Sequence, residues 1–221
     1  MTDERVPTPA LVECLAPTGF IDSVDPSIVA CVEELRVAAL PPAERAAALF
    51  RFVRDEVRYE FMAKLTAEEY RASYVLRERR GFCVQKAVLM CALSRAAGVP
   101  CALVLSDLVD HSLSPKIASA LGTNVMFHHG LNAIHVDGRW LKADASLSPD
   151  LTSRKGYRLV DFDGTADALL PATTLAGTPH ATYARFHGTY ADLPFERMLN
   201  AFIEAYRHAN VQALAELGFG L

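Results

Sequence analysis

The sequence lacks the features that mark membrane, secreted or nucleic-acid-binding proteins. No apolar run approaches the roughly 20 residues that a membrane-spanning helix needs, and the first residues lack the basic and apolar regions of a secretory signal. The charge is nearly balanced, with 22 basic and 26 acidic residues, and no basic stripe is interleaved with aromatic residues. We therefore expect no nucleic-acid partner and no membrane association.

Cysteine usage excludes a disulfide framework. The five cysteines are an odd number and contain no C-x-x-C spacing. This usage is typical of a reducing compartment, so we expect a cytoplasmic protein. A zinc site would have to combine His111, His129, His135 and Asp144, which lack the short spacing of typical ligand pairs. The sequence thus predicts no cofactor and leaves the oligomeric state open.

The order of the expected elements indicates a single α+β domain of 221 residues, with helices first and antiparallel strands after them. We expect an irregular arm over 1–24, a helix from Asp25-Pro26, a second helix after Pro41-Pro42, a short helix capped by Thr66-Ala-Glu-Glu69, strands over 101–106, 125–136 and 139–144, and a C-terminal helical segment over 194–218. Residues 107–124 and 145–190 are expected to be irregular.

A cysteine at the start of a predicted buried helix is the most informative residue. Cys83 follows Gly81-Phe82, and residues 84–97 are apolar on nearly every face of a helix. Unpaired backbone N–H groups and the positive end of the helix dipole favour the thiolate there, which is the nucleophilic form. The alternative is a buried structural thiol, which we expect for Cys91 and Cys101.

A predicted hairpin supplies a base for this thiol. Asp137-Gly138 is typical of a two-residue turn, so Val136 should pair with Arg139. In this register His129 and Asp144 share one face as diagonal neighbours, within reach of each other. His129 would accept the thiol proton, and Asp144 would orient the imidazole.

Two other histidines compete for the role of base. His135 shares the face of His129, but it sits against Trp140 and farther from Asp144. His128 points to the other face, where packing or a strand end is its expected role.

These motifs together resemble the transglutaminase-like superfamily. The family pattern runs from a G-x-C at the head of a buried helix, through R-A-x-G-[IV]-P, to an H, a W eleven residues later and a D four residues beyond it. The chain matches each step with Gly81-Phe-Cys83, Arg95-Ala-Ala-Gly98-Val-Pro100, His129, Trp140 and Asp144. The resemblance covers 78–146 and is looser over 55–59 and 70–73, where it points to a bacterial branch. It implies a papain-like fold with a Cys-His-Asp catalytic core and acyl transfer through a thioester.

The chain departs from the family pattern beside two of these residues. The usual H-A-W-x-E is His129-Gly-Leu-Asn-Ala133 here, and the usual D-P-T is Asp144-Ala-Ser146. Protein crosslinking is therefore not implied, and a catalytically inactive binding or scaffold domain is the alternative. An enzyme should place the Cys83 sulfur within roughly 3–4 Å of a His129 nitrogen.

The substrate site is less defined by the sequence. Tyr74 is a candidate second oxyanion donor, Asp110 and His111 are candidates for the cleft wall, and Trp140 is a candidate substrate contact. The expected rim, 107–124 and 145–190, holds small and apolar residues rather than a charge cluster. We expect a small-molecule, peptide or carrier-bound acyl substrate, with hydrolysis and amide formation both open.

Overall fold

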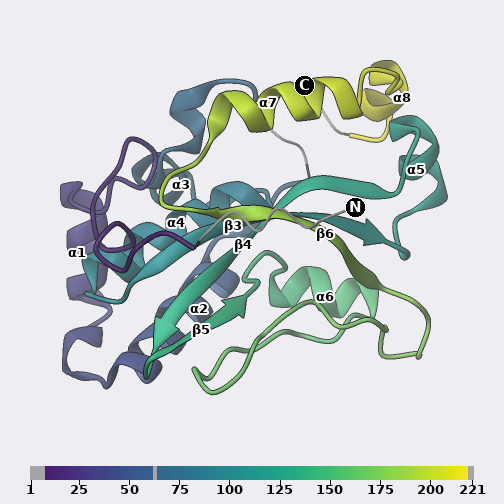
Figure 1. Ribbon diagram of the computed structural model, residues 1–221. Helices are drawn as coiled ribbons and strands as arrows, with labels where there is room; N and C mark the ends of the chain where they lie inside the picture. Colours follow the sequence, from purple (N-terminus) through teal and green to yellow (C-terminus); the bar gives the residue numbers. More distant parts are fainter. Residues whose placement is uncertain (1–7, 62–63, 219–221) are drawn as a thin grey trace.

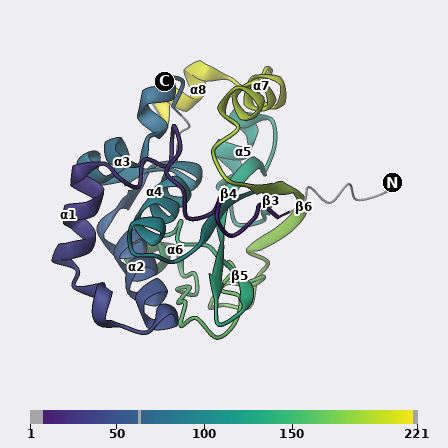
Figure 2. The same ribbon diagram turned by 60° about the vertical axis from the view of Figure 1, so that its left-hand side comes forward.

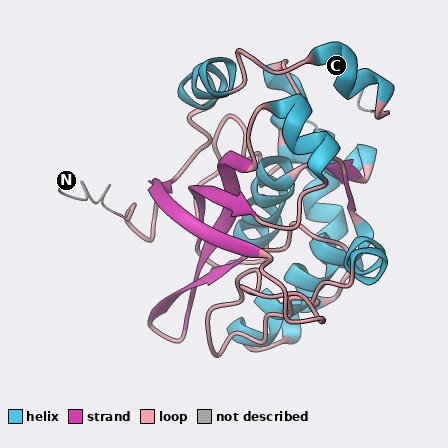
Figure 3. Ribbon diagram, turned by 90° about the vertical axis from the view of Figure 1, so that its right-hand side faces the viewer, coloured by secondary structure: helices cyan, strands magenta, loops and turns pink. Residues whose placement is uncertain are grey.

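The structure, a computed structural model, describes residues 8–61 and 64–218. Its centre is an antiparallel sheet with the strand order β5-β4-β3-β6. The strands are β3 (Cys101–Asp110), β4 (Val125–Val136), β5 (Arg139–Ala143) and β6 (Ala181–Tyr190). A short parallel pair, β1 (Arg58–Tyr59) and β2 (Arg80–Gly81), lies apart from the main sheet (Figure 3). Together with the helices, this sheet confirms the α+β class.

The N-terminal helices gather on one side of the sheet (Figure 2). They are α1 (Pro26–Glu34), α2 (Pro42–Glu56), α3 (Ala72–Glu78) and α4 (Cys83–Ala96), with the short 3-10 helices η1 (Val37–Ala39) and η2 (Ala67–Tyr70). Every residue of α4 from Cys83 to Arg95 is buried, because α4 contacts β3 and β4 as well as α1, α2 and α3. The all-round apolar pattern therefore predicted its position correctly.

Four more helices complete the described part of the chain: α5 (Pro115–Leu121), α6 (Pro149–Lys155), α7 (Phe195–Ala205) and α8 (Val211–Glu216). Figure 1 shows α7 above the sheet and α6 below it. The expected helical segment over 194–218 is thus two helices, and α7 buries Phe195, Met198 and Phe202. No helix within the described ranges combines the length and apolarity that a bilayer crossing requires.

Local signals set several boundaries as expected. Asp25 caps α1 by accepting a hydrogen bond from the Ser27 amide at 2.9 Å. Asp137 and Gly138 form the hairpin turn with φ values of 49° and 76°, and the pair Val136–Arg139 confirms the register. That register sends alternate residues of β4 and β5 toward α4 and toward the opposite face.

Other sequence expectations were wrong. The Thr66 side chain caps no backbone amide and donates to Glu69 Oε2 instead, and the short helix that follows is the 3-10 helix η2, with α3 beginning only at Ala72. The stretches 107–124 and 145–190, expected to be irregular, contain the end of β3, the helices α5 and α6, and the whole of β6.

The N-terminal arm is irregular over residues 8–25, and residues 1–7 lie outside the described part. It nevertheless contributes to the core, because Cys14 and Ile21 are fully buried. Cys14 packs with Ala102 and Val104 of β3 in a small cluster separate from the α4 core. The arm thus helps to cover the sheet face that α4 leaves open.

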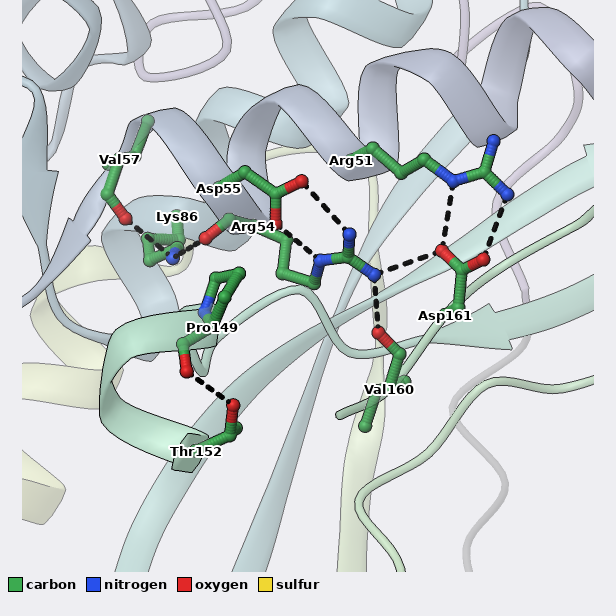
Figure 4. A network of polar contacts seen from close by, with 9 residues as sticks. All are labelled: Arg51, Arg54, Asp55, Val57, Lys86, Pro149, Thr152, Val160 and Asp161. Atoms are coloured by element: carbon green, nitrogen blue, oxygen red, sulfur yellow. Dashed lines mark hydrogen bonds and ion pairs between the residues drawn. The ribbon is translucent and has the colours of Figure 1, made fainter. Parts of the chain in front are cut away.

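A buried lysine ties α4 to the end of α2 (Figure 4). The Lys86 ammonium donates to the Val57 carbonyl at 2.7 Å and lies 3.4 Å from the Arg54 carbonyl. These carbonyls are at the negative end of the α2 dipole. Burial lowers the pKa of Lys86 to about 7, against the opposing charges of Asp144 and Asp55. Lys86 therefore joins the first turn of α4 to the C-terminal end of α2.

Candidate active site

His129 and Asp144 form a buried pair where β4 and the end of β5 come together. His129 Nε2 lies 2.6 Å from Asp144 Oδ2. The Tyr183 hydroxyl also donates to Oδ2 at 2.6 Å, and the Ser146 amide donates to Oδ1 at 3.0 Å. Burial would raise the pKa of Asp144, but the charge of His129 and these hydrogen bonds lower it below its usual value. Asp144 is therefore a carboxylate at neutral pH.

Cys83 is the other close neighbour of the His129 ring. Because Nε2 faces Asp144, Nδ1 is the nitrogen left for the thiol. Burial would lower the pKa of His129, yet the Asp144 and Cys83 charges and hydrogen bonds to both raise it to about 10. The three residues named from sequence thus come together as thiol, imidazole and carboxylate.

A glycine brings the helix and the strand together at this point. A Cβ on Gly130 would lie 2.6 Å from Val84 Cα and 2.9 Å from Val84 N, closer than real Cβ contacts. Gly130 follows His129 and Val84 follows Cys83, so this backbone contact sets the spacing between the thiol and the imidazole. Sequence reasoning missed this role, although the glycine in place of the family's alanine was a visible signal.

Gln85 holds the first turn of α4 from the other side. Its Oε1 accepts from the Phe82 amide at 3.1 Å, and its Nε2 donates to the Glu69 carbonyl at 2.6 Å. The glutamine therefore serves structure rather than chemistry, and it fixes the segment that carries Cys83.

A cavity of about 400 Å³ opens beside His129. Its wall is apolar where Leu108, Met126 and Leu170 line it, and it carries charged groups of both signs. The other lining residues come from four stretches of the chain: Arg58, Tyr59, Glu60 and Phe61; Asp110, Ser112, Leu113 and Ile117; Leu147, Ser148, Asp150, Leu151, Arg154, Lys155 and Tyr157; and His180 and Ala181.

The cavity agrees in part with the sequence expectations. Asp110 lines it as proposed, and the stretches 107–124 and 145–190 form much of the wall. The sequence did not predict that residues 58–61 line the cavity, because β1 is only two residues long and too short to give a strand pattern. The rim was expected to hold small and apolar residues rather than a charge cluster; it carries apolar residues together with charges of both signs, namely Arg58, Arg154 and Lys155 and the acidic Glu60, Asp110 and Asp150.

Three other proposed contacts lie elsewhere. Tyr74 is on the face of α3 away from its buried positions, with the Arg77 guanidinium over its ring. His111 is exposed and bonds to Thr182. Trp140 pairs with His135 near the hairpin turn, with ring centroids 5.2 Å apart. None of these residues lines the cavity that holds His129.

The structure also places the two competing histidines and the four residues considered for zinc. His135 stays beside Trp140, and His128 is buried against α7, with its ring near Phe202. Of the four residues considered for zinc, only His129 and Asp144 come together. His111 and His135 lie at other positions of the sheet.

Comparisons with known proteins identify the fold family. The model of the transglutaminase-like superfamily matches residues 30–145. A candidate cysteine protease from Cytophaga hutchinsonii aligns over 80% of this chain and 54% of its own, with 17% identity and a TM-score of 0.42.

The periplasmic domain of TgpA from Pseudomonas aeruginosa aligns over 60% of this chain and 45% of its own, with 26% identity and a TM-score of 0.42. Its ethylmercury-bound form aligns over 62% and 49%, with 24% identity and a TM-score of 0.44. The chain spans about half the length of these structures. No functionally curated protein matches the sequence.

Proposed function

The chain belongs to the transglutaminase-like superfamily, and from this premise we propose that it catalyses cysteine-dependent acyl transfer through a thioester. One observation carries the proposal: His129 is bonded to Asp144 through Nε2, and its other neighbour is the Cys83 side chain. Cys83 is the nucleophile, His129 the general base and acid, and Asp144 the orienting carboxylate. Residues 78–146 form the catalytic core of a single domain.

The reaction follows from the charges of this set. The Cys83 thiolate attacks the substrate carbonyl, and a C–S bond forms as the carbonyl π electrons move to oxygen. Collapse of this intermediate breaks the bond to the leaving amine, which takes the proton from His129. Water or a second amine then attacks the thioester, gives its proton to His129 and regenerates the thiolate. Throughout, Asp144 stabilises the protonated imidazole.

The oxyanion needs two hydrogen-bond donors. The backbone N–H of Cys83, in the first turn of α4, is the first donor. For the second, Tyr59 replaces Tyr74. Tyr59 lines the cavity, and the charges of Cys83 and Asp144 reach its hydroxyl, which burial and these charges keep protonated by raising its pKa. A protonated phenol is a hydrogen-bond donor, as the role requires.

The cavity favours a compact acyl donor. Its volume suits a small amide, a peptide end or a carrier-bound acyl group. Apolar residues would hold the acyl chain, while the basic Arg154 and Lys155 and the acidic Asp110 and Asp150 would meet polar groups of the substrate. All five cysteines are free, which is typical of the reducing cytoplasm, and we propose that location.

Trapping the nucleophile tests the assignment. Wild-type protein and Asp144→Asn are treated with iodoacetamide at neutral pH, and the alkylated cysteines are mapped by mass spectrometry. The four other thiols of the same chain are the internal control, since they are buried as Cys83 is but lie away from His129. We expect Cys83 to react fastest and Asp144→Asn to slow only Cys83. Reaction at Cys83 no faster than at a free thiol peptide refutes its role as the nucleophile.

A substrate screen tests the reaction class. Wild type and Cys83→Ala are incubated with amides, peptides and acyl thioesters, with and without added amines, and the products are read by mass spectrometry. Turnover that depends on Cys83 supports acyl transfer, and amine incorporation distinguishes amide formation from hydrolysis. Cys83-dependent crosslinking of casein without turnover of small donors contradicts the compact substrate.

A further inference from the structure

A second group of polar side chains lies on the sheet, on the side of His128 rather than of His129. It consists of Asp107 on β3, His128 on β4 and His187 on β6, three strands that are neighbours in the sheet (Figure 1). One ligand atom from each lies within 4.8 Å of the others, and no other group of three such residues occurs in the described ranges. His187 Nε2 is 2.7 Å from Asp107 Oδ1, and the two imidazoles stack at 4.0 Å.

All three strands break their regular pairing at this point. The register of β3 with β4 shifts between Ser106 and Leu108, which leaves Asp107 out of that ladder. His128 adopts a left-handed backbone with φ 51°. In β6, Phe186 and Gly188 pair with consecutive residues of β3, so His187 is the extra residue of a bulge. Bulges re-aim side chains, and here they direct three of them to one place.

The His128 amide donates to Asp107 Oδ1 at 3.2 Å, but hydrogen bonding leaves its imidazole incompletely paired. Its side chain is 7% exposed, and its Nδ1 atom is buried without a hydrogen-bond partner. A buried polar nitrogen left unpaired costs free energy, and so does a left-handed conformation at a residue with a side chain. The stacking on His187 covers the ring faces but not this nitrogen. The cluster therefore contains a buried imidazole nitrogen that no hydrogen bond of the described residues satisfies.

We propose that Asp107, His128 and His187 bind one divalent transition-metal ion of the zinc type. Two imidazoles and one carboxylate are a common protein ligand set for such ions, with water at the fourth position. Ligand atoms in a tetrahedral site with bonds of about 2.0 Å lie ~3.3 Å apart. The three ligand atoms here lie within 4.8 Å of one another, so side-chain rotation must bring them closer together. Arg185 and Arg197 are near His128 and reduce the affinity for a cation.

The ion would clamp β3, β4 and β6 beside the candidate active site. His128 directly precedes His129, so the metal would stabilise the bulged backbone that positions the His129 side chain. The ligands are distinct from the proposed triad, because His128 faces Phe202 of α7 while His129 faces Asp144. The proposal therefore does not depend on acyl transfer.

Metal titration tests the site in a background that removes the competing thiol. Cys83→Ala protein is stripped with chelator, dialysed and titrated with Zn²⁺ by calorimetry and with Co²⁺ by visible absorption. We expect one equivalent to bind and the melting temperature to rise. In this background, Asp107→Asn and His187→Gln should weaken binding by more than about tenfold, and His111→Gln, a change of an exposed histidine, should not.

His187 and Asp107 are partly accessible, with side chains 10% and 14% exposed, so these variants should fold even if changes at His128 do not. Circular dichroism of each variant checks this. No binding to Cys83→Ala, or equal binding to Asp107→Asn and His187→Gln, overturns the site. Binding by wild type that disappears in Cys83→Ala also overturns it, because the metal is then held by the thiol.

Discussion

Replacing Gly130 by alanine tests whether the contact between α4 and β4 sets the reactive geometry. The added Cβ would lie 2.6 Å from Val84 Cα, whereas ordinary contact begins at 3.4 Å, so the two backbones must separate by about 0.8 Å. That displacement falls between Cys83 and His129, the proposed nucleophile and base. Misplacement of reacting groups by about 1 Å can cost on the order of 10²-fold in rate.

We therefore expect Gly130→Ala to lower kcat by on the order of 10²-fold and to leave KM nearly unchanged. Overpacking should also lower the free energy of unfolding by about 1–3 kcal/mol. The iodoacetamide rate at Cys83, measured against pH, reports the thiol–imidazole contact without a known substrate. Urea unfolding measures the stability separately.

Two further variants separate geometry from general damage. Gly19→Ala is the matched control, because its Cβ would meet only Asp192 Oδ2 at an ordinary 3.5 Å. Val84→Ala should not rescue Gly130→Ala, since the clash is with the Val84 backbone as well as its side chain. If Gly130→Ala keeps the wild-type alkylation rate and pH profile while folded, the contact does not position the pair.

Two more predictions concern groups that support the site. Tyr183→Phe removes a hydrogen-bond donor to Asp144, so the free energy of unfolding should fall by about 1–3 kcal/mol. The pH below which Cys83 alkylation slows should move upward, because the carboxylate then protonates at higher pH. Tyr190→Phe, on the same strand, is the control, and an unchanged pH profile for Tyr183→Phe contradicts the expectation. Lys86 has a folded pKa of about 7, so between pH 7 and its usual 10.5 the unfolded chain binds the extra proton. Stability should rise with pH in that window, by at most about 1.4 kcal/mol per unit. Urea unfolding should show this rise in wild type and in Lys116→Met, an exposed control, but not in Lys86→Met, and a flat wild-type curve refutes it.

The sequence predicted best where the signal is local or strongly periodic. The α4 helix was visible because its apolar residues cover every face, and the hairpin because Asp137-Gly138 requires a left-handed turn. The register then followed from that turn, and it placed His129 and Asp144 on the same face. Docking of the Cys83 end of α4 beside this pair could not be predicted, because α4 packs on the side of β4 that carries Gly130 and Asn132, and its approach depends on a backbone contact between Gly130 and Val84, 46 positions apart.

The missed elements had weaker or overlooked signals. α5 and α6 are only seven residues long, yet each begins at a Ser-Pro and ends before a left-handed glycine, Gly122 and Gly156. Those signals are in the sequence and would have found both helices. β6 is different: it is an edge strand with exposed residues such as Phe186. Its pairing with β3 is set by contacts about 80 positions away, which no local pattern reports.

The departures from the family pattern acquire a physical meaning in the structure. Gly130 stands where the family has alanine, and it is the residue that meets the α4 backbone. Leu131 and Ala133 stand where the family has the aromatic and the acid, and both pack in the small cluster with Cys14 on the sheet face that α4 leaves open. The Ser146 amide donates to Asp144, a contact that depends on the backbone rather than on the side chain.

The changed positions Gly130 and Ser146 therefore still connect the strand and the carboxylate to their neighbours. Loss of the family residues was the reason to consider a binding domain without catalysis. Leu131 and Ala133 pack on the sheet face that α4 leaves open, and the bond between His129 and Asp144 is still made, so the departures do not decide between the two functions. The two functions differ instead in the reactivity of Cys83: an enzyme requires this thiol to react faster than the other four, whereas a binding domain does not.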